Sequence, residues 1–323
     1  MKGEESNTTR QLRRAGVIPV VKVNAPGQAV SVADALQAGG LPIVEIPFRS
    51  DAAEEAIRLL RTKRPDLTVG AGTILTKAQA ERAIDAGAHF MVTPGFNPSI
   101  AEYCAEQDIE FMPGVNTPGE IEQAMALGLF MLKFFPAKTS GEVSAIKALQ
   151  SVYPNTEFIP MGGVNTDNLA TYLRLKNCPA VGGTWIAPSD LVESENYGEI
   201  TRRAEEALEI AAGFDLAHVG INAGSSDEAK RIAEEFSIVF GFPVKEGNSS
   251  VFAGDGFEIM KKQGLGSHGH LAIHTNKVDV ALGLLERRGI DVRPETVKEV
   301  DGSVRAVYLK PEVAGFAIHL LQR

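Results

Sequence analysis

Eight short apolar runs, which recur about every 20 to 25 residues, constrain the fold of this chain more than any other feature. They are VIPVVKV (17–23), PIVEIPF (42–48), LTVGAGT (67–73), HFMVTPG (89–95), EFMPGV (110–115), FMLKFFP (130–136), EFIPMGG (157–163) and AVGGTW (180–185). Amphipathic stretches such as 51–64 and 77–88 separate them. Nearly continuous apolar strands that alternate with helices are typical of a parallel sheet buried on both faces.

Eight strand–helix units within about 200 residues predict an α/β fold of the (β/α)8 TIM-barrel type. A doubly wound parallel sheet is the alternative, because it is built from the same units. The barrel is favoured because each of the eight runs has Pro, Gly or a polar residue among its last three positions, which suits the rim where barrels bind their ligands.

The pattern changes near residues 211–215, where a predicted helix over 199–213 ends at a glycine. Five of the six histidines follow this point. A strand, a helix and several short strands then occur twice, opening with LAHVGIN (216–222) and with GHLAIHT (269–275). We therefore predict a barrel over 1–212 and a smaller α+β domain over 214–323, in which a strand–helix–strands pattern occurs twice. A Ser225–Glu228 capping box should begin the first helix of the second domain.

Composition excludes several classes of partner. The net charge is -9 without a basic run, which argues against nucleic acid because phosphate neutralisation needs clustered Lys and Arg. Two widely separated cysteines favour a reducing compartment over a disulfide framework. The start, MKGEESNTTRQLRRAG, lacks the apolar core of a signal peptide, and no stretch reaches the roughly 18 apolar residues of a membrane helix. We expect a soluble cytoplasmic protein with no membrane partner.

Lys133 lies in FMLKFFPA (130–137), a run that contains three phenylalanines. Apolar surroundings lower the pKa of a lysine from about 10.4 and favour the neutral amine that Schiff-base chemistry requires. Strand alternation places Met131, Lys133 and Phe135 on one side, which in a barrel is the interior. A lysine at a strand end can instead extend its ammonium to solvent, and this is the structural alternative.

Glu45 in PIVEIPF places a carboxylate inside a second apolar strand. Two opposite ionisable groups in two strands of one barrel predict a shared site. A buried ion pair without function is the alternative, but such pairs contribute little net stability. Function therefore explains Lys133 and Glu45 better than stability does. Lys22 in VVKVN is a second lysine near the rim and an alternative nucleophile.

Six motifs occur together over the first 212 or so residues: VEIPFRS (44–50), VGAGT (69–73), TPG (93–95), LKFFPA (132–137), GGV (162–164) and GGTW (182–185). In this combination they resemble the 2-keto-3-deoxy-6-phosphogluconate / 4-hydroxy-2-oxoglutarate aldolase family of class I aldolases. The resemblance implies a (β/α)8 barrel that assembles as a homotrimer.

The resemblance also implies roles for particular positions. Lys133 resembles the Schiff-base lysine, and Glu45 resembles the general acid/base, which moves protons partly through a water. Arg49 and Thr73 resemble groups that bind the pyruvoyl carboxylate, a task that suits a guanidinium fork. The other implied substrate-binding residues are Pro94 and Gly95 beside the imine, Phe135, Met161, and Gly162, Gly163, Gly183 and Thr184 in a phosphate pocket. Glycines in that pocket let backbone N–H groups approach an anion at a helix start.

Met161 departs from the family pattern. In PMGGV it stands where the phosphogluconate enzymes commonly carry Thr before the glycine pair. A thioether cannot donate the hydrogen bond that a hydroxyl gives to the substrate. The galactonate-type C4 epimer and an unphosphorylated 2-keto-3-deoxy acid therefore remain alternative substrates.

The implied reaction is reversible retro-aldol cleavage of a 2-keto-3-deoxy-6-phospho sugar acid, or of 4-hydroxy-2-oxoglutarate, as in Entner–Doudoroff carbohydrate metabolism. It yields pyruvate and an aldehyde such as glyceraldehyde 3-phosphate. The lysine imine serves as the electron sink, so the aldolase needs no cofactor. This makes the expected enzyme an aldehyde-lyase whose partners are small 2-keto acids.

The C-terminal part resembles the vicinal oxygen chelate superfamily, which includes glyoxalases. The resemblance implies paired βαβββ modules around a metal, with ligands from the first and last strand of each module. The matching residues here are His218, Glu258, His270 and His319. Imidazole and carboxylate ligands suit a divalent Zn, Ni, Mn or Fe ion. His319 departs from the glutamate that is more usual there. A non-catalytic sensor or oligomerisation module is the alternative to a catalytic domain.

Overall fold

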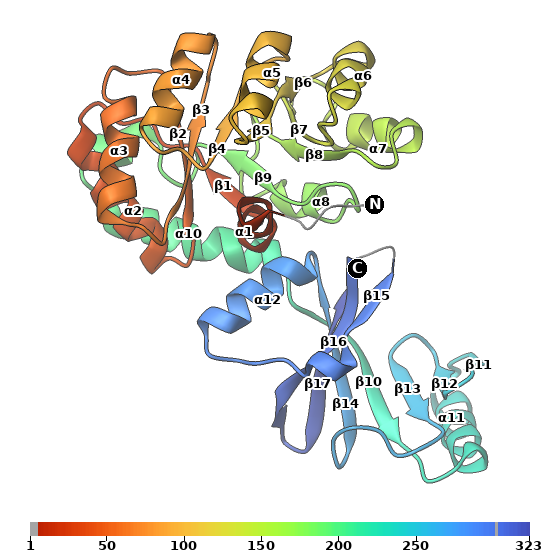
Figure 1. Cartoon of the computed structure of the whole chain (residues 1–323). Coiled ribbons are helices and arrows are strands. Elements are labelled where there is room, and N and C mark those ends of the chain that lie inside the picture. The colour runs from red at the N-terminus through yellow and green to blue at the C-terminus, as the bar shows by residue number, and fades with distance from the viewer. Residues whose placement is uncertain (1–5, 301–302) are drawn as a thin grey trace. The chain divides into compact units, whose positions relative to one another are not determined.

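The computed structural model of the protein describes residues 6–300 and 303–323. The chain divides into two compact units, Met1–Ala211 (unit 1) and Ala212–Arg323 (unit 2). Unit 1 is an α/β structure, and unit 2 contains one mixed sheet (Figure 1). Over the described ranges, no helix combines the length and the apolar character needed to cross a membrane.

The strands of unit 1 coincide with the apolar runs of the sequence. They are β1 (Val17–Pro19), β2 (Ile43–Pro47), β3 (Thr68–Gly72), β4 (Phe90–Val92), β5 (Glu110–Met112), β6 (Gly114–Val115), β7 (Met131–Phe134), β8 (Glu157–Pro160) and β9 (Val181–Gly183). All their pairings are parallel: β2-β3-β4-β5, β6-β7-β8 and β1-β9. Single bridges join Val20 to Glu45 and Met161 to Gly182, so the pairings return from β9 to β1.

The fifth apolar run forms two strands rather than the single predicted one. Pro113 separates β5 from β6 because a proline has no N–H to donate to a ladder. The Pro113 carbonyl still accepts a hydrogen bond from the Lys133 amide, 2.9 Å away. The Thr93 side chain accepts a hydrogen bond from the Gly114 amide in the same region. The chain direction therefore continues through the break, and β6 lies beside β7.

Helices alternate with these strands and surround them in Figure 1. They are α1 (Asn7–Ala15), α2 (Pro26–Ala38), α3 (Ala53–Lys63), α4 (Lys77–Asp85), α5 (Pro98–Glu106), α6 (Pro118–Ala126), α7 (Glu142–Val152), α8 (Leu169–Leu173), α9 (Ser189–Glu193) and α10 (Tyr197–Ala212). Asn97 and Thr117 cap α5 and α6, each followed by a proline at the first helical position. Fully buried Phe90, Phe134 and Phe158 are among the largest core side chains.

Unit 2 contains an eight-stranded sheet in the order β11-β12-β13-β10-β14-β17-β16-β15. Its strands are β10 (Asp215–Asn222), β11 (Val244–Glu246), β12 (Ser250–Ala253), β13 (Phe257–Met260), β14 (Gly269–Thr275), β15 (Lys298–Val300), β16 (Ser303–Val313) and β17 (Phe316–Gln322). The first strand of each half pairs in parallel with the last strand of that half, β10 with β13 and β14 with β17. The two halves meet where β10 pairs antiparallel with β14.

In the part of unit 2 that the structure describes, each half has one α-helix, α11 (Ser226–Phe240) or α12 (Val278–Arg287), and a short 3-10 helix (Pro294–Thr296) precedes β15. The expected capping box at α11 forms only in part. The Ser225 side chain accepts a hydrogen bond from the Glu228 amide, but the Glu228 carboxylate accepts from the Gly224 amide instead of the Ser225 amide. The carboxylate therefore binds the amide one residue before the helix cap.

Candidate active site and candidate metal centre

Lys133 and Glu45 line one cavity of about 370 Å³ in unit 1. Fourteen residues line it: Val20, Glu45, Arg49, Thr73, Pro94, Lys133, Phe135, Met161, Gly162, Gly163, Val164, Gly183, Thr184 and Trp185. Most of them lie at or just beyond the carboxyl ends of their strands, and Glu45 lies in the middle of β2. This is the end at which parallel α/β folds place their ligands.

The cavity has a buried floor and an exposed rim. Lys133 is 7% exposed, Glu45 1% and Met161 3%, whereas Arg49 and Thr184 are exposed. The ionisable pair on the floor is therefore shielded from solvent, and the rim carries groups that can meet a charged molecule at its entrance. The arrangement suits a substrate whose reacting carbon lies deep and whose charged ends remain nearer the surface.

Burial shifts the two floor residues in opposite directions. Desolvation lowers the pKa of Lys133, with Arg49 adding to that effect and Glu45 opposing it. Desolvation raises the pKa of Glu45, and the positive charges of Lys133 and Arg49 oppose it. Both shifts favour the neutral forms, an amine and a carboxylic acid. A neutral amine is a nucleophile, and an acid with a raised pKa can exchange protons near neutral pH.

The contacts of each group are specific. The Lys133 ammonium lies 4.9 Å from the centroid of the Phe135 ring, which covers one side of it. Glu45 Oε2 is buried without a hydrogen-bond partner among the described residues. Gly72 leaves room for this carboxylate, because a Cβ there would lie 1.9 Å from Glu45 Oε1. A carboxyl that is buried, unpaired and closely fitted is poised to act on a molecule in the cavity.

The glycine-rich rim differs in one detail from the prediction. Gly162 and Gly163 follow β8 with φ of 86° and 87°, a backbone conformation that glycine adopts readily. They do not lie at a helix start, because α8 begins only at Leu169. An intervening turn, in which Asn168 Oδ1 accepts a hydrogen bond from the Asn165 amide, separates them from the helix.

Eleven of the twelve residues predicted for this site line the cavity, and Gly95 does not. Its amide lies instead close to Gly114, where a Cβ would approach it to 2.6 Å. The structure adds Val20, Val164 and Trp185, which sequence reasoning missed. Val164 and Trp185 belong to the GGV and GGTW motifs, and Val20 belongs to the first apolar run. The roles predicted for neighbouring motif residues were the available signal for Val164 and Trp185, and Val20 had no such signal.

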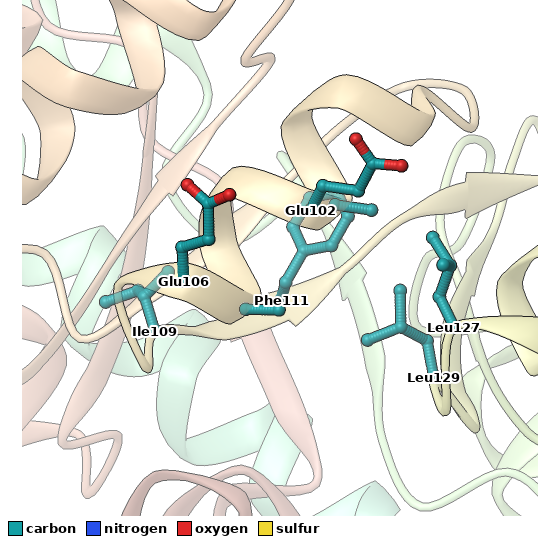
Figure 2. Close-up of a pocket in the computed structure, with 8 residues that line it drawn as sticks. Glu102, Glu106, Ile109, Phe111, Leu127 and Leu129 are labelled. Carbon is teal, nitrogen blue, oxygen red and sulfur yellow. The ribbon is translucent and has the colours of Figure 1, made fainter.

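A second cavity, of about 310 Å³, lies between α5 and the segment after α6. Figure 2 shows the side chains that line it, which include Ile109, Phe111, Leu127 and Leu129 beside the carboxylates of Glu102 and Glu106. Apart from these two carboxylates, its lining residues carry no group for acid, base or nucleophilic chemistry. The cavity that contains Lys133 and Glu45 is therefore the candidate active site.

In unit 2 the four predicted ligand residues converge on one point. The ligand atoms of His218, His270 and His319 all lie within 4.8 Å of one another. Glu258 Oε2 lies 3.1 Å from His218 Nε2 and 3.2 Å from His270 Nε2, and the two imidazole nitrogens are 3.2 Å apart. Ligands about 2.1 Å from one metal ion are separated by roughly 3 to 3.5 Å, so these spacings fit a single ion.

The electrostatics of this group match a ligand set. His319 Nε2 is buried without a hydrogen-bond partner among the described residues, and burial, with His270 and His218, lowers the pKa of His319 to about 3. Burial alone would raise the pKa of Glu258, but hydrogen bonds with His218, His270 and Ser250 outweigh it and lower the pKa well below its usual range. Neutral imidazole and ionised carboxylate are the states that bind metal ions.

Two neighbours hold the group in place. Ser250 donates a 2.7 Å hydrogen bond to Glu258 Oε1, which orients the carboxylate. Gly220 lies opposite His270 in the β10–β14 ladder, and a Cβ at Gly220 would lie 2.1 to 2.4 Å from atoms of the His270 ring. His268 and His274, which the sequence did not place among the ligands, are not part of the group.

Comparison with known proteins identifies unit 1. The model of the family "KDPG and KHG aldolase" matches residues 8–203. The chain belongs to the KDPG and KHG aldolase family. It is 42% identical over 209 residues to the 2-dehydro-3-deoxy-phosphogluconate aldolase of Haemophilus influenzae, which spans 64% of this chain and 99% of that protein. The family and the enzyme class predicted from the sequence, an aldehyde-lyase, are confirmed.

Solved structures agree with this family. The KDPG aldolase of Legionella pneumophila, with pyruvate captured at low pH as a covalent carbinolamine intermediate, has a TM-score of 0.61 and 32% identity. It covers 64% of this chain and 99% of its own. The aldolase of Zymomonas mobilis solved with 3-phosphoglycerate has a TM-score of 0.58 and 33% identity, covering 62% and 94%. The family model ends at residue 203, so the assignment applies to unit 1.

Proposed function

We propose that this aldolase cleaves a 2-keto-3-deoxy-6-phospho sugar acid, or 4-hydroxy-2-oxoglutarate, to pyruvate and an aldehyde through an imine on Lys133. The observation that carries the proposal is the burial of Lys133 and Glu45 together on the floor of one cavity. The carbinolamine that pyruvate forms in the Legionella pneumophila relative supports the covalent chemistry. The same chemistry needs no metal, because the protonated imine accepts the electrons of the broken bond.

In the proposed mechanism, neutral Lys133 Nζ attacks the 2-keto carbon, and Glu45 gives its proton to the departing hydroxyl. Water leaves, and a protonated imine and a Glu45 carboxylate remain. Glu45, as a carboxylate, takes the proton of the C4 hydroxyl. The C3–C4 bond then breaks, its electrons move into the imine to form an enamine, and the aldehyde departs. Glu45 returns a proton to C3, and hydrolysis of the imine releases pyruvate and the free lysine.

The other residues of the cavity are proposed to bind and orient the substrate. Arg49, whose charge acts on both floor residues, and Thr73 are assigned to the pyruvoyl carboxylate, and Pro94 and Phe135 are assigned to the walls beside the imine. Gly162, Gly163, Gly183 and Thr184 form the rim assigned to the phosphate. The Zymomonas mobilis relative was solved with 3-phosphoglycerate, which supports phosphate recognition in this family. The positive φ of the two consecutive glycines turns backbone amides without interference from a Cβ.

Met161 favours a second candidate, an aldolase for the galactonate-type epimer or an unphosphorylated acid. Its side chain is buried and packs over Gly182, where a Cβ would meet Met161 Cε at 2.5 Å. The cavity wall at this position is therefore apolar and offers no donor to a substrate hydroxyl. Kinetics with the two C4 epimers, each with and without the 6-phosphate, decide between the candidates. If the phosphogluconate substrate is correct, kcat/KM is largest for the gluconate-derived phosphorylated acid.

Trapping with borohydride tests the nucleophile. Borohydride and pyruvate together should label Lys133 covalently, and Lys133→Met should abolish both the label and the activity. Lys22→Met is the matched control, since Lys22 is the alternative lysine and does not line the cavity. It should retain both. A full label on Lys22 with an unlabelled Lys133 would refute the proposed mechanism.

For the architecture, we propose a (β/α)8 TIM barrel over 1–212 that assembles as a homotrimer, followed by a vicinal oxygen chelate domain over 214–323. The ring of parallel pairings from β1 to β9 supports the barrel. In unit 2, each half has the order strand, helix, three strands and pairs its first strand with its last, which supports two βαβββ modules. Light scattering of the full chain measures the trimer directly.

We further propose that unit 2 binds one divalent ion through His218, Glu258, His270 and His319. The orphaned His319 nitrogen and the 3.1 to 3.2 Å spacings of the other ligand atoms support the fit. Such an ion would supply Lewis acidity to a bound oxygen. Zn, Ni, Mn and Fe suit this donor set. A non-catalytic sensor or assembly role remains the second candidate for the domain.

Elemental analysis of the untagged full chain tests the metal site. Near-stoichiometric metal should be present, and His218→Ala and His270→Ala should each remove it. His268→Ala is the matched control, because His268 lies outside the ligand group, and it should keep the ion. If the full chain takes up no metal from Zn, Ni, Mn or Fe(II), the metal site is refuted and the sensor or assembly role is favoured.

A further inference from the structure

The aromatic side chains beside the metal group differ in what they can offer a ligand. Phe252 lies edge-on to His218, with ring centroids 6.1 Å apart. Tyr308 stacks on His319 at 4.7 Å with 25° between the planes, and lies edge-on to His270 at 6.1 Å. Both rings therefore border the group, but only Tyr308 carries a hydroxyl that can donate a hydrogen bond.

Strand pairing fixes the position of Tyr308. It lies directly opposite His319 in the β16–β17 ladder. Side chains of directly opposite residues project from the same face of a sheet. The β16–β17 ladder loses its register between Tyr308 and Glu312, a stretch of β16 that contains Pro311, so Tyr308 belongs to the last regular pair before that shift. Tyr308 is therefore held on the metal-facing side of the sheet by both the ladder and the ring stack.

The Tyr308 hydroxyl has no hydrogen-bond partner among the residues that the structure describes, and its side chain is only partly buried. Ser250, the other hydroxyl beside the group, already donates to Glu258. A divalent ion held by four protein ligands can accept at least one more ligand by expanding its coordination. An oxygen bound at such an open position lies close to the three imidazoles and to the phenol that stacks on one of them.

We propose that Tyr308 donates a hydrogen bond to a small oxyanion, such as a carboxylate, bound at the metal of unit 2. The proposal rests on the metal site proposed above. Tyr308 is then a ligand-binding residue. The metal would bind one oxygen of the oxyanion, and the phenol would donate its hydrogen bond to the same oxygen or to the other one. A metal-binding anion with a weaker acceptor than a carboxylate oxygen gains less from Tyr308, so the residue selects oxyanions over such anions.

Cobalt substitution tests this in the full chain. Co(II) reports both metal binding and added ligands through its visible absorption, without any assay of activity. Oxalate is the oxyanion probe, and thiocyanate is the anion that binds cobalt without a carboxylate oxygen. Tyr308→Phe should bind one Co(II) per chain, as the unaltered protein does. Its oxalate dissociation constant should rise about tenfold, the usual effect of removing a hydrogen bond to a charged group, with thiocyanate affinity unchanged.

Phe252→Leu is the matched control, because it removes the other bordering ring without removing a donor, and it should leave the preference for oxalate over thiocyanate unchanged. Equal oxalate affinity in Tyr308→Phe and the unaltered protein would overturn the proposal while leaving the metal site in place. Loss of cobalt from Tyr308→Phe would also overturn the proposal, because it would show that Tyr308 supports the metal site structurally. Absence of cobalt from the unaltered protein would instead refute the metal site itself, and the proposal with it.

Discussion

Gly72→Ala tests the position of the Glu45 carboxylate, because it should move this group without removing it. Gly72 ends β3 and has no positive φ, so alanine fits the backbone without strain. A Cβ at this position would lie 1.9 Å from Glu45 Oε1 and 2.6 Å from its Cδ. Ordinary contact distances exceed 3 Å, so the carboxylate must retreat by about 1 Å or more. The substituted residue itself does not line the cavity.

A displacement of about 1 Å at a catalytic group costs roughly 100-fold in rate, which corresponds to about 2.7 kcal/mol in the barrier. We therefore expect kcat for pyruvate formation to fall about 100-fold in Gly72→Ala. The slow borohydride label on Lys133 should still reach completion, because the nucleophile is untouched. The assay is steady-state pyruvate release alongside mass spectrometry of the trapped protein.

Gly70→Ala in the same strand is the matched control. Its Cβ would meet the buried Phe90 ring at 2.1 Å, so it should lower stability by about 1 to 3 kcal/mol through overpacking. Its folded fraction should keep kcat. If Gly72→Ala retains kcat within threefold, or if both variants lose kcat equally, the argument that Gly72 positions Glu45 is wrong.

Four further outcomes follow from the same contacts. The double variant Lys133→Met, Glu45→Gln should be inactive yet about 1 kcal/mol or more stable to urea, because it removes the cost of burying two ionisable groups; lower stability would contradict this. Burial lowers the pKa of Lys133, so its trapping rate should stay constant as pH falls below 10.5 and decline only at the lower pKa where the amine protonates; an inflection at the ordinary lysine value would contradict it. Thr73→Gly should raise the unfolding free energy by about 1 kcal/mol, because Thr73 has a φ of 56°, while KM for the keto acid rises; calorimetry and kinetics check both. Gly220→Ala should weaken metal binding about 10- to 100-fold, since the His270 ring must move away, and unchanged metal affinity by competition with a chelator would refute that.

The strands and the floor residues of unit 1 could be predicted from the sequence because burial on both faces leaves a continuous apolar run. A charged residue inside such a run is unusual and can be recognised from the sequence, as Lys133 and Glu45 were. Contacts between distant segments left no such signal. Val20 was missed because an apolar side chain at a strand end looks like core, and its place in the wall depends on the pairing with Glu45.

Local backbone geometry explains the remaining differences. Pro113 lies inside an apolar run that reads as one strand, and the missing N–H divides it. The spacing of Ser225 and Glu228 fits a capping box, but the Glu228 carboxylate accepts from the Gly224 amide and not from the Ser225 amide. The two amides are adjacent in the chain, and the sequence does not show which of them the carboxylate will bind. The sequence predicted Gly162 and Gly163 at a helix start. They lie instead in a loop with positive φ values, and α8 begins six residues after Gly163.

The two candidate sites control ionisation by opposite means. On the floor of the cavity in unit 1, desolvation is the largest influence on the Lys133 amine and on the Glu45 carboxyl, so each is driven towards its neutral form. In unit 2, hydrogen bonds from two imidazoles and Ser250 overcome the desolvation of Glu258 and keep it ionised, while His319 stays neutral. The first arrangement suits covalent chemistry with proton exchange, and the second suits metal ligation. A charged residue in an apolar run therefore indicates a site, but only its partners in space decide which chemistry that site supports.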